Sequence, residues 1–173
     1  ESDPTNPTYP DALNRLGDCL FHERKFKEAS SIYKQVANLN SIGTDYALLQ
    51  DGYAQGLMHK FAEKIDVLTT LIQQYPYSDY ADDALYEIAR AELQQEHHAD
   101  AIKAYQQLLK NYPNSNRAVI ASLAGFVIIR DMVLNVSSNP LISEAIAMNI
   151  LAGITGSSSG GMSIALSTLG ADY

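Results

Sequence analysis

The amino-acid sequence predicts an all-α protein in which three helix pairs stack as a short right-handed solenoid and two to three apolar helices follow. Apolar residues recur three and four positions apart in stretches of about 13 residues, as in amphipathic helices. These stretches come in pairs that repeat, so Ala29, Lys64 and Ala101 share one template position. Charge nearly stops after Asn116, beyond which the charged residues are only Arg117, Arg130, Asp131, Glu144 and Asp172.

Residues 1–9 are expected to form a disordered lead-in, because they combine prolines with Asp, Asn and Thr. The three helix pairs are expected at about residues 10–44, 45–81 and 82–116. The residues that define their common template are Leu13, Leu16, Gly17, Leu20, Phe26, Ala29, Ile32, Tyr33 and Val36 in the first pair, Leu48, Gly52, Phe61, Ile65, Leu68, Leu71 and Pro76 in the second, and Leu85, Ile88, Ala89, Ala101, Ile102, Tyr105, Leu108 and Pro113 in the third.

Small residues recur where the two helices of a pair are expected to cross. Gly17, Gly52 and Ala89 let the first helix approach the second closely, and Tyr33 and Tyr105 are expected to fill the remaining space. Each of the last two pairs ends in a proline that is followed by residues able to cap the next helix. These endings are Tyr75-Pro76-Tyr77-Ser78-Asp79 and Tyr112-Pro113-Asn114-Ser115-Asn116.

Three short motifs in residues 10–116 resemble tetratricopeptide repeats, namely Leu16-Gly17-Asp18, Phe26-Lys27-Glu28-Ala29 and Ala101-Ile102-Lys103-Ala104-Tyr105. The middle pair departs from the family pattern, with Asp51 and Lys64 where Leu and Ala are usual, and this predicts a looser pair there. The Tyr-Pro-x-Ser endings also resemble repeats of bacterial envelope proteins. The cell envelope is therefore the expected location, with the cytoplasm as the alternative.

The tetratricopeptide resemblance implies that ligands bind in a concave groove lined by the first helix of each pair. Tyr46, Tyr53, Tyr86 and Arg90 would be its anchors, because aromatic and Arg side chains dominate binding energies. The alternative is that these tyrosines only pack between repeats. The Lys and Asn set with which family members clamp a C-terminal carboxylate is missing, which disfavours a receptor for chaperone tails. A basic or mixed apolar peptide is expected as the ligand instead. The groove positions carried over are Asn14, Asp18, Phe21, Tyr46, Leu49, Tyr53, Tyr86, Arg90 and Leu93.

Composition and motifs argue against several classes of function. A net charge of −8 makes nucleic acid a poor partner. No Ser/His/Asp signature, phosphate loop or metal-ligand spacing occurs, and the adjacent His97 and His98 are expected at a helix–helix turn. We therefore expect no catalysis, metal or cofactor. The single cysteine, Cys19, is expected to be a small core residue.

Residues 117–173 are expected to form an apolar helical segment. Residues 118–129 lack a polar face, but the run is too short to cross a bilayer, which needs about 20 residues. The Thr155-Gly156-Ser157-Ser158-Ser159-Gly160-Gly161 stretch then separates further apolar residues. This pattern fits either a discontinuous membrane helix or a flexible linker between buried soluble helices.

The segment NILAGITGSSSGGMSIAL at residues 149–166 resembles part of the gluconate permease family. That resemblance implies a piece of a proton-coupled sugar-acid carrier, with membrane contact through residues 118–169. The candidate substrate-binding residues are Asn149, Thr155, Ser157 and Ser159. A repeat array joined directly to a carrier segment suggests a fragment or a chimeric reading frame with its junction near residues 116–119.

Taken together, the sequence predicts a protein–protein interaction scaffold that binds a protein or peptide partner in the groove of its helical repeats. The alternative is a fragment of a gluconate-type membrane transporter, carried by the C-terminal segment. A purely structural adaptor without a groove ligand is a third hypothesis.

Overall fold

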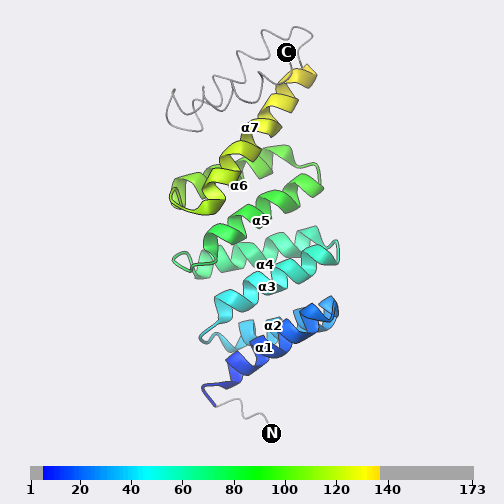
Figure 1. The fold of residues 1–173 in the computed structure, drawn as a ribbon, viewed down its shortest axis with the longest axis vertical. Helices are drawn as coiled ribbons and strands as arrows, with labels where there is room; N and C mark the ends of the chain where they lie inside the picture. The colour runs from blue at the N-terminus through cyan, green and yellow to red at the C-terminus, as the bar shows by residue number, and fades with distance from the viewer. Residues whose placement is uncertain (1–5, 137–173) are drawn as a thin grey trace. The chain divides into compact units, whose positions relative to one another are not determined.

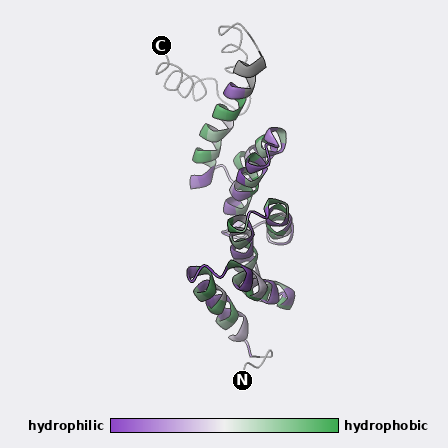
Figure 2. Cartoon of the chain, turned by 90° about the vertical axis from the view of Figure 1, so that its right-hand side faces the viewer, coloured by the Kyte–Doolittle hydropathy of each residue, from purple (hydrophilic) through white to green (hydrophobic). Residues whose placement is uncertain are grey.

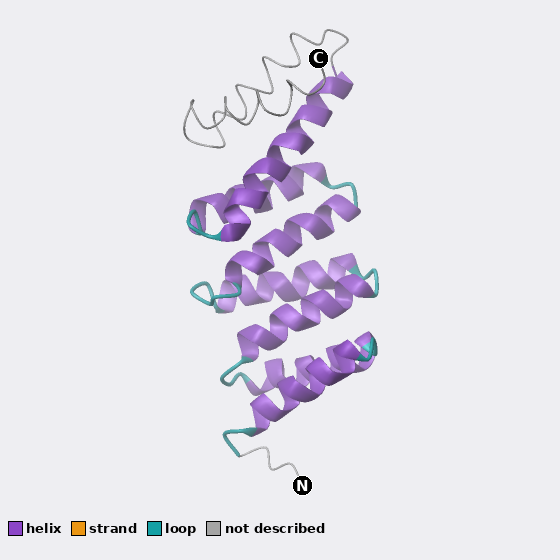
Figure 3. Cartoon of the chain, in the orientation of Figure 1, coloured by secondary structure: helices purple, strands orange, loops and turns teal. Residues whose placement is uncertain are grey.

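The computed structural model describes residues 6–136, and the side chains of residues 6–131. All regular structure in this part of the chain is helical (Figures 1 and 3). The six helices of the predicted pairs are each 14 residues long, and the seventh has 21. The helices are α1 (Tyr9–His22), α2 (Phe26–Leu39), α3 (Thr44–Leu57), α4 (Phe61–Gln74), α5 (Ala81–Gln94), α6 (His98–Asn111) and α7 (Asn116–Val136).

Residues 6–104 belong to one compact unit, and the chain from Tyr105 onward belongs to another. In the first unit the consecutive helices among α1 to α5 pack on one another, and α3 also contacts α5. This stacking of consecutive antiparallel helices confirms the expected solenoid for these elements (Figure 1). The predicted repeat boundaries at residues 44, 81 and 116 stay predictions.

Glycine brings the helices of the first two pairs together, as predicted. A Cβ atom on Gly17 would lie 2.5 Å from Cε1 of Tyr33, and one on Gly52 would lie 2.5 Å from Cδ2 of Leu68. Both partner side chains are fully buried. The first-helix backbone therefore rests directly on a large side chain of the second helix.

The turn inside each pair has the same geometry three times. Arg24, His59 and Glu96 adopt left-handed φ angles of 62°, 58° and 62°. In each turn the following residue donates its N–H to a carbonyl five positions back, over 2.9 Å, as in a Schellman motif. The positions with φ near 60° are occupied by residues with a Cβ, which costs about 1–2 kcal/mol each relative to the right-handed region.

Replacing Arg24 by glycine is expected to raise the free energy of unfolding by roughly 0.5–1 kcal/mol, because glycine adopts φ of 62° without strain. Urea denaturation followed by circular dichroism measures the change. Arg24→Ala is the matched control, since it removes the same side chain but keeps the Cβ. Equal stability of the glycine and alanine variants would contradict the strain argument.

One expectation for α1 is wrong, because Cys19 is exposed and is not a core residue. Leu16, a residue of the repeat template, is also 47% exposed. Leu13 and Gly17 make the contact with α2 instead, because Leu13 clusters with Ala29 and Tyr33, and Gly17 lies under the Tyr33 ring. At about 100° per residue, Leu16 and Cys19 lie roughly 100° and 160° around the helix from Gly17, and so away from the contact with Tyr33.

Helix α7 begins where the sequence places the start of the apolar segment. The Ser115 hydroxyl accepts a hydrogen bond from the backbone N–H of Arg117 over 2.9 Å, so the predicted cap is confirmed. Hydrophobic residues dominate most of its described length (Figure 2). The helix does not end at Arg130 and Asp131, which pair with each other over 2.9 Å. Among residues 6–136, no helix combines the length and apolarity of a membrane span. The other predicted apolar helices lie outside the described residues.

Candidate functional site

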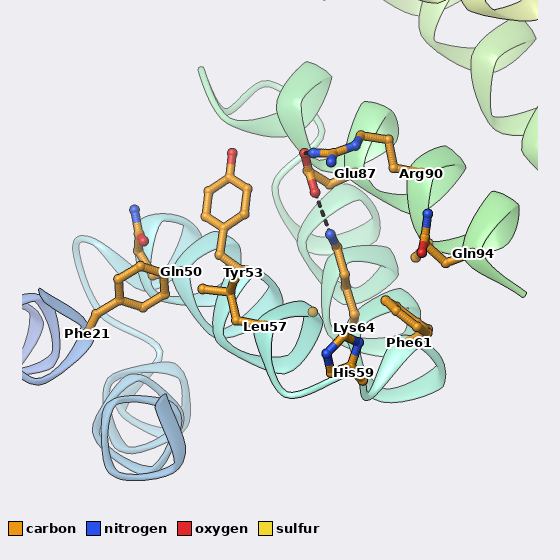
Figure 4. A pocket seen from close by; sticks show the side chains of 12 residues that line it. Phe21, Gln50, Tyr53, Leu57, His59, Phe61, Lys64, Glu87, Arg90 and Gln94 are labelled. Atoms are coloured by element: carbon orange, nitrogen blue, oxygen red, sulfur yellow. Dashed lines mark hydrogen bonds and ion pairs between the residues drawn. The ribbon is translucent and has the colours of Figure 1, made fainter. Parts of the chain in front are cut away.

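A pocket of about 510 Å³ opens beside α3 and α5 in the first unit (Figure 4). Its lining comes mainly from the first helices of the pairs, with additions from the turn before α4 and from the beginning of α4. We call it the α3–α5 pocket. It is lined by Phe21, Gln50, Tyr53, Gly56, Leu57, His59, Phe61, Lys64, Glu87, Arg90, Ala91 and Gln94.

A buried ion pair forms one wall of the α3–α5 pocket. The Lys64 ammonium donates to Oε2 of Glu87, and only 8% and 5% of these two side chains are exposed. Arg90 donates from Nη1 to the other carboxylate oxygen, Oε1, over 2.8 Å. Gly56 leaves room for the Lys64 stem, because a Cβ there would lie 3.1 Å from Cδ of Lys64. The pair joins α4 to α5, which belong to successive helix pairs.

Two effects oppose each other at the Glu87 carboxyl. Burial alone would raise its pKa, but the hydrogen bonds and charges of Lys64 and Arg90 outweigh burial and lower the pKa. Glu87 is therefore held as a carboxylate in the folded protein, and the stability that it contributes depends on pH.

A carboxyl group whose pKa is lower in the folded state stabilises fully above its unfolded pKa, and this stabilisation disappears as pH falls through the folded pKa. The loss for Glu87 therefore begins near its ordinary value of 4.5 and extends below it. We expect wild type and Glu87→Gln to differ most in unfolding free energy at neutral pH and to converge in acid. Urea denaturation across this pH range measures the difference, and a constant difference would contradict the assignment.

Aromatic side chains lie in and beside the α3–α5 pocket. Phe21 meets Phe26 edge-on with their centroids 5.3 Å apart, and His59 meets Phe61 at 5.9 Å. The guanidinium of Arg90 lies 5.9 Å from the centroid of the Tyr86 ring. Tyr53 rises from α3 toward Glu87 and Arg90 (Figure 4). The pocket thus combines large apolar surfaces with a fixed set of charges.

The structure places the predicted groove residues in several locations. Phe21, Tyr53 and Arg90 line the α3–α5 pocket, and Tyr86 packs on Arg90. Leu93 is half-buried, and Leu49 is only 3% exposed, so Leu49 offers almost no surface. The remaining three, Asn14, Asp18 and Tyr46, line a separate hollow of about 290 Å³ with Asp11, Arg15 and Gly43. Their role in binding stays a prediction.

Asp18 joins the first three helices. Its Oδ1 accepts hydrogen bonds of 2.8 Å from the hydroxyls of both Tyr33 and Tyr46. Burial and the Asp18 carboxylate raise the pKa of both tyrosines, so the hydroxyls stay protonated donors. The Tyr46 ring also lies 5.7 Å from that of Tyr80. These contacts fit the alternative that Tyr46 packs between repeats.

Sequence reasoning missed a buried polar cluster between α2 and α3. Asp51 accepts hydrogen bonds at Oδ1 from the Ser30 hydroxyl over 2.6 Å and from Nε2 of Gln55 over 3.1 Å, while Lys34 lies 4.0 Å from Oδ2. Burial raises the pKa of Asp51, against the lowering effect of Ser30, Lys34 and Gln55. The available signal was Asp51 at a position where the family has Leu. A polar residue on a buried helix face needs a partner.

The four candidate transporter residues, Asn149, Thr155, Ser157 and Ser159, lie outside the described residues, as does most of the expected membrane contact at 118–169. In the described part of the chain, no group of three or more His, Cys, Asp or Glu side chains could hold a metal ion.

Comparison with known proteins adds sequence matches. Residues 10–42 and 83–115 each match a family model described as tetratricopeptide repeat. A stretch of 55 residues is 44% identical to the uncharacterized transporter YxjC of Bacillus subtilis (strain 168). That stretch is 32% of this chain and only 12% of the transporter, so the chain spans a small part of that protein.

The fold of this chain is similar to those of solved repeat proteins. A tetratricopeptide repeat protein from Parabacteroides merdae ATCC 43184 superposes with a TM-score of 0.60 at 16% identity, over 94% of this chain and 65% of that one. The TPR-like repeats of a putative kinesin light chain from Podosopora anserina give 0.55 at 10% identity, over 92% and 93%. The family-model matches and these structural neighbours together support tetratricopeptide repeats in this chain.

Proposed function

We propose that the chain is a protein–protein interaction scaffold that binds a peptide segment of a partner in the α3–α5 pocket. One observation carries the proposal. Aromatic, aliphatic and Arg side chains from α1, α3 and α5, the first helices of the three pairs, converge on one pocket of about 510 Å³. Tetratricopeptide repeats generally bind protein or peptide partners, which agrees with this site.

The lining is suited to a peptide because its anchors are held in place before binding. Arg90 is fixed by Glu87 and by the Tyr86 ring, and Phe21 by Phe26. Large side chains that lose little freedom on binding give the strongest contributions to interfaces. The lining contains no Ser or Cys nucleophile and no paired acids, so we infer a binding role and not a catalytic one.

Replacing Tyr53 by alanine is expected to weaken peptide capture by at least about tenfold, as for a typical interface hot spot. Immobilised protein would be panned against a random peptide library, and the affinity of enriched peptides measured by fluorescence anisotropy. Tyr77→Ala is the matched control, since Tyr77 is 98% exposed and lies in the loop between α4 and α5. Unchanged capture by Tyr53→Ala and by Arg90→Ala would favour a structural adaptor without a groove ligand.

The alternative function is a fragment of a membrane transporter, for which the short stretch of identity to the Bacillus subtilis transporter is the motivating observation. A sugar acid as its substrate rests only on the resemblance of residues 149–166 to gluconate permeases. Its test is flotation with liposomes of the whole chain beside a chain that ends at Asn116. Flotation of the longer chain alone would support a membrane segment beyond the repeats. If neither chain floats with the liposomes, the membrane function is contradicted and the scaffold function alone stands.

A further inference from the structure

The α3–α5 pocket differs in charge from the chain as a whole. The chain carries a net charge of −8, but the pocket lining holds one carboxylate, Glu87, beside the two cations Lys64 and Arg90. Both oxygens of Glu87 accept hydrogen bonds from these cations. The lining therefore has an excess of positive charge before His59 is counted.

The positive charge that solvent can reach in the pocket is that of Arg90. Its side chain is 58% exposed, whereas the Lys64 side chain is 8% exposed and is occupied with Glu87. Apolar side chains flank the charges, and among them Leu57 is 51% exposed. In Figure 4, Leu57 on α3 and Phe21 on α1 lie across the pocket from Arg90 on α5. A cation and an apolar surface thus line the same pocket.

We propose, on the basis of the proposed function, that this pocket binds an internal peptide segment in which an Asp or Glu side chain lies close to a large apolar residue. The carboxylate meets the Arg90 guanidinium, whose planar shape suits carboxylates. The apolar residue packs against Leu57 and Phe21. A basic segment finds no matching group, because the carboxylate of the lining is engaged through both oxygens.

The carboxylate is assigned to a side chain and not to a chain terminus. The lining continues along α5 for one more helical turn, from Arg90 to Gln94, and Phe61 lies beside this end (Figure 4). A peptide that follows the pocket therefore passes the guanidinium and extends beyond it. This preference for an acidic residue differs from the basic or mixed apolar peptide that is expected from the sequence.

A library of short random peptides, N-acetylated and C-amidated, tests the proposal with the whole chain as bait. Wild type is expected to enrich peptides with Asp or Glu within a few positions of Leu, Ile, Phe or Met. Arg90→Gln is expected to weaken their binding roughly tenfold, and Arg90→Glu to shift enrichment toward Lys and Arg. Lys103→Glu makes the same charge change on an exposed side chain outside the pocket and should leave the selection unchanged.

The outcomes separate this inference from the proposed function. If wild type enriches no peptide, both fail. If the enriched peptides depend on Tyr53 but show no preference for acidic residues, or prefer basic ones, the scaffold stands and the acidic-apolar partner is overturned. Enrichment that appears only with free C-termini overturns the side-chain assignment. Circular dichroism of each variant confirms that altered selection does not come from unfolding.

Discussion

Replacing Lys64 by methionine is expected to lower the free energy of unfolding by about 3 kcal/mol, the low end of the range for breaking a buried ion pair. Methionine keeps most of the volume of the lysine stem and removes the ammonium. Glu87, whose side chain is 5% exposed, then keeps only Arg90 as its cation. Most of the loss comes from leaving a carboxylate buried with too little compensation.

The double variant Lys64→Met/Glu87→Leu is expected to recover most of this loss, because apolar residues of similar volume can replace a buried ion pair at little cost. Urea denaturation of wild type, both single variants and the double variant gives the coupling energy of the pair. Wild-type stability of Lys64→Met, or a double variant no more stable than the single ones, would show that the pair does not join α4 to α5.

Alanine occupies the equivalent positions of the other pairs, at Ala29 and Ala101, and both are fully buried. A comparison of repeats alone would therefore predict that Lys64→Ala is harmless. We expect the reverse, since alanine removes both the charge and the stem that packs beside Gly56. The residue at this position depends on its neighbours in the next pair and not only on the template.

Local patterns were enough to predict the helices and the close contacts within pairs. The spacing of apolar residues predicted two helices of about 13 residues in each pair, and six helices of 14 residues lie between Tyr9 and Asn111. Small residues marked the contacts of Gly17 and Gly52. Which side chains interact between successive helix pairs could not be predicted from local patterns. Lys64 and Glu87 are 23 positions apart, and the residues around each of them do not predict that the two side chains form an ion pair.

The candidate site was predictable only in part, for a related reason. Phe21, Tyr53 and Arg90 follow from template positions on the first helices, and they do line the α3–α5 pocket. His59 and Phe61 were missed because they come from the turn and the beginning of a second helix, which the template assigns to packing. Whether Leu49 faces the core or the groove depends on the exact rotation of α3, which the degenerate pattern of the middle pair leaves open.

Replacing Gly17 by alanine is expected to lower the free energy of unfolding by about 2 kcal/mol, although alanine usually favours a helix over glycine by roughly 1 kcal/mol. The new Cβ would lie 2.5–2.9 Å from three atoms of the Tyr33 ring. That ring is fully buried, and its hydroxyl is held by Asp18 over 2.8 Å. The ring is stiff, so relief requires α1 and α2 to move apart.

Two other glycines supply matched controls for the same substitution. At Gly52 the Cβ would lie 2.5 Å from Cδ2 and 2.7 Å from Cγ of Leu68, and because this aliphatic side chain can rotate more readily than the tethered Tyr33 ring, a smaller loss is expected than at Gly17. At Gly125 in α7 the added carbon would meet no other side chain or helix within 4 Å among the described residues, and a gain of up to roughly 1 kcal/mol is expected from helix propensity. Thermal and urea denaturation should therefore rank the variants Gly125→Ala above Gly52→Ala above Gly17→Ala. A Gly17→Ala variant as stable as Gly52→Ala or Gly125→Ala would mean that α1 and the Tyr33 ring can move apart at little cost, and that Asp18 does not fix the ring against the glycine.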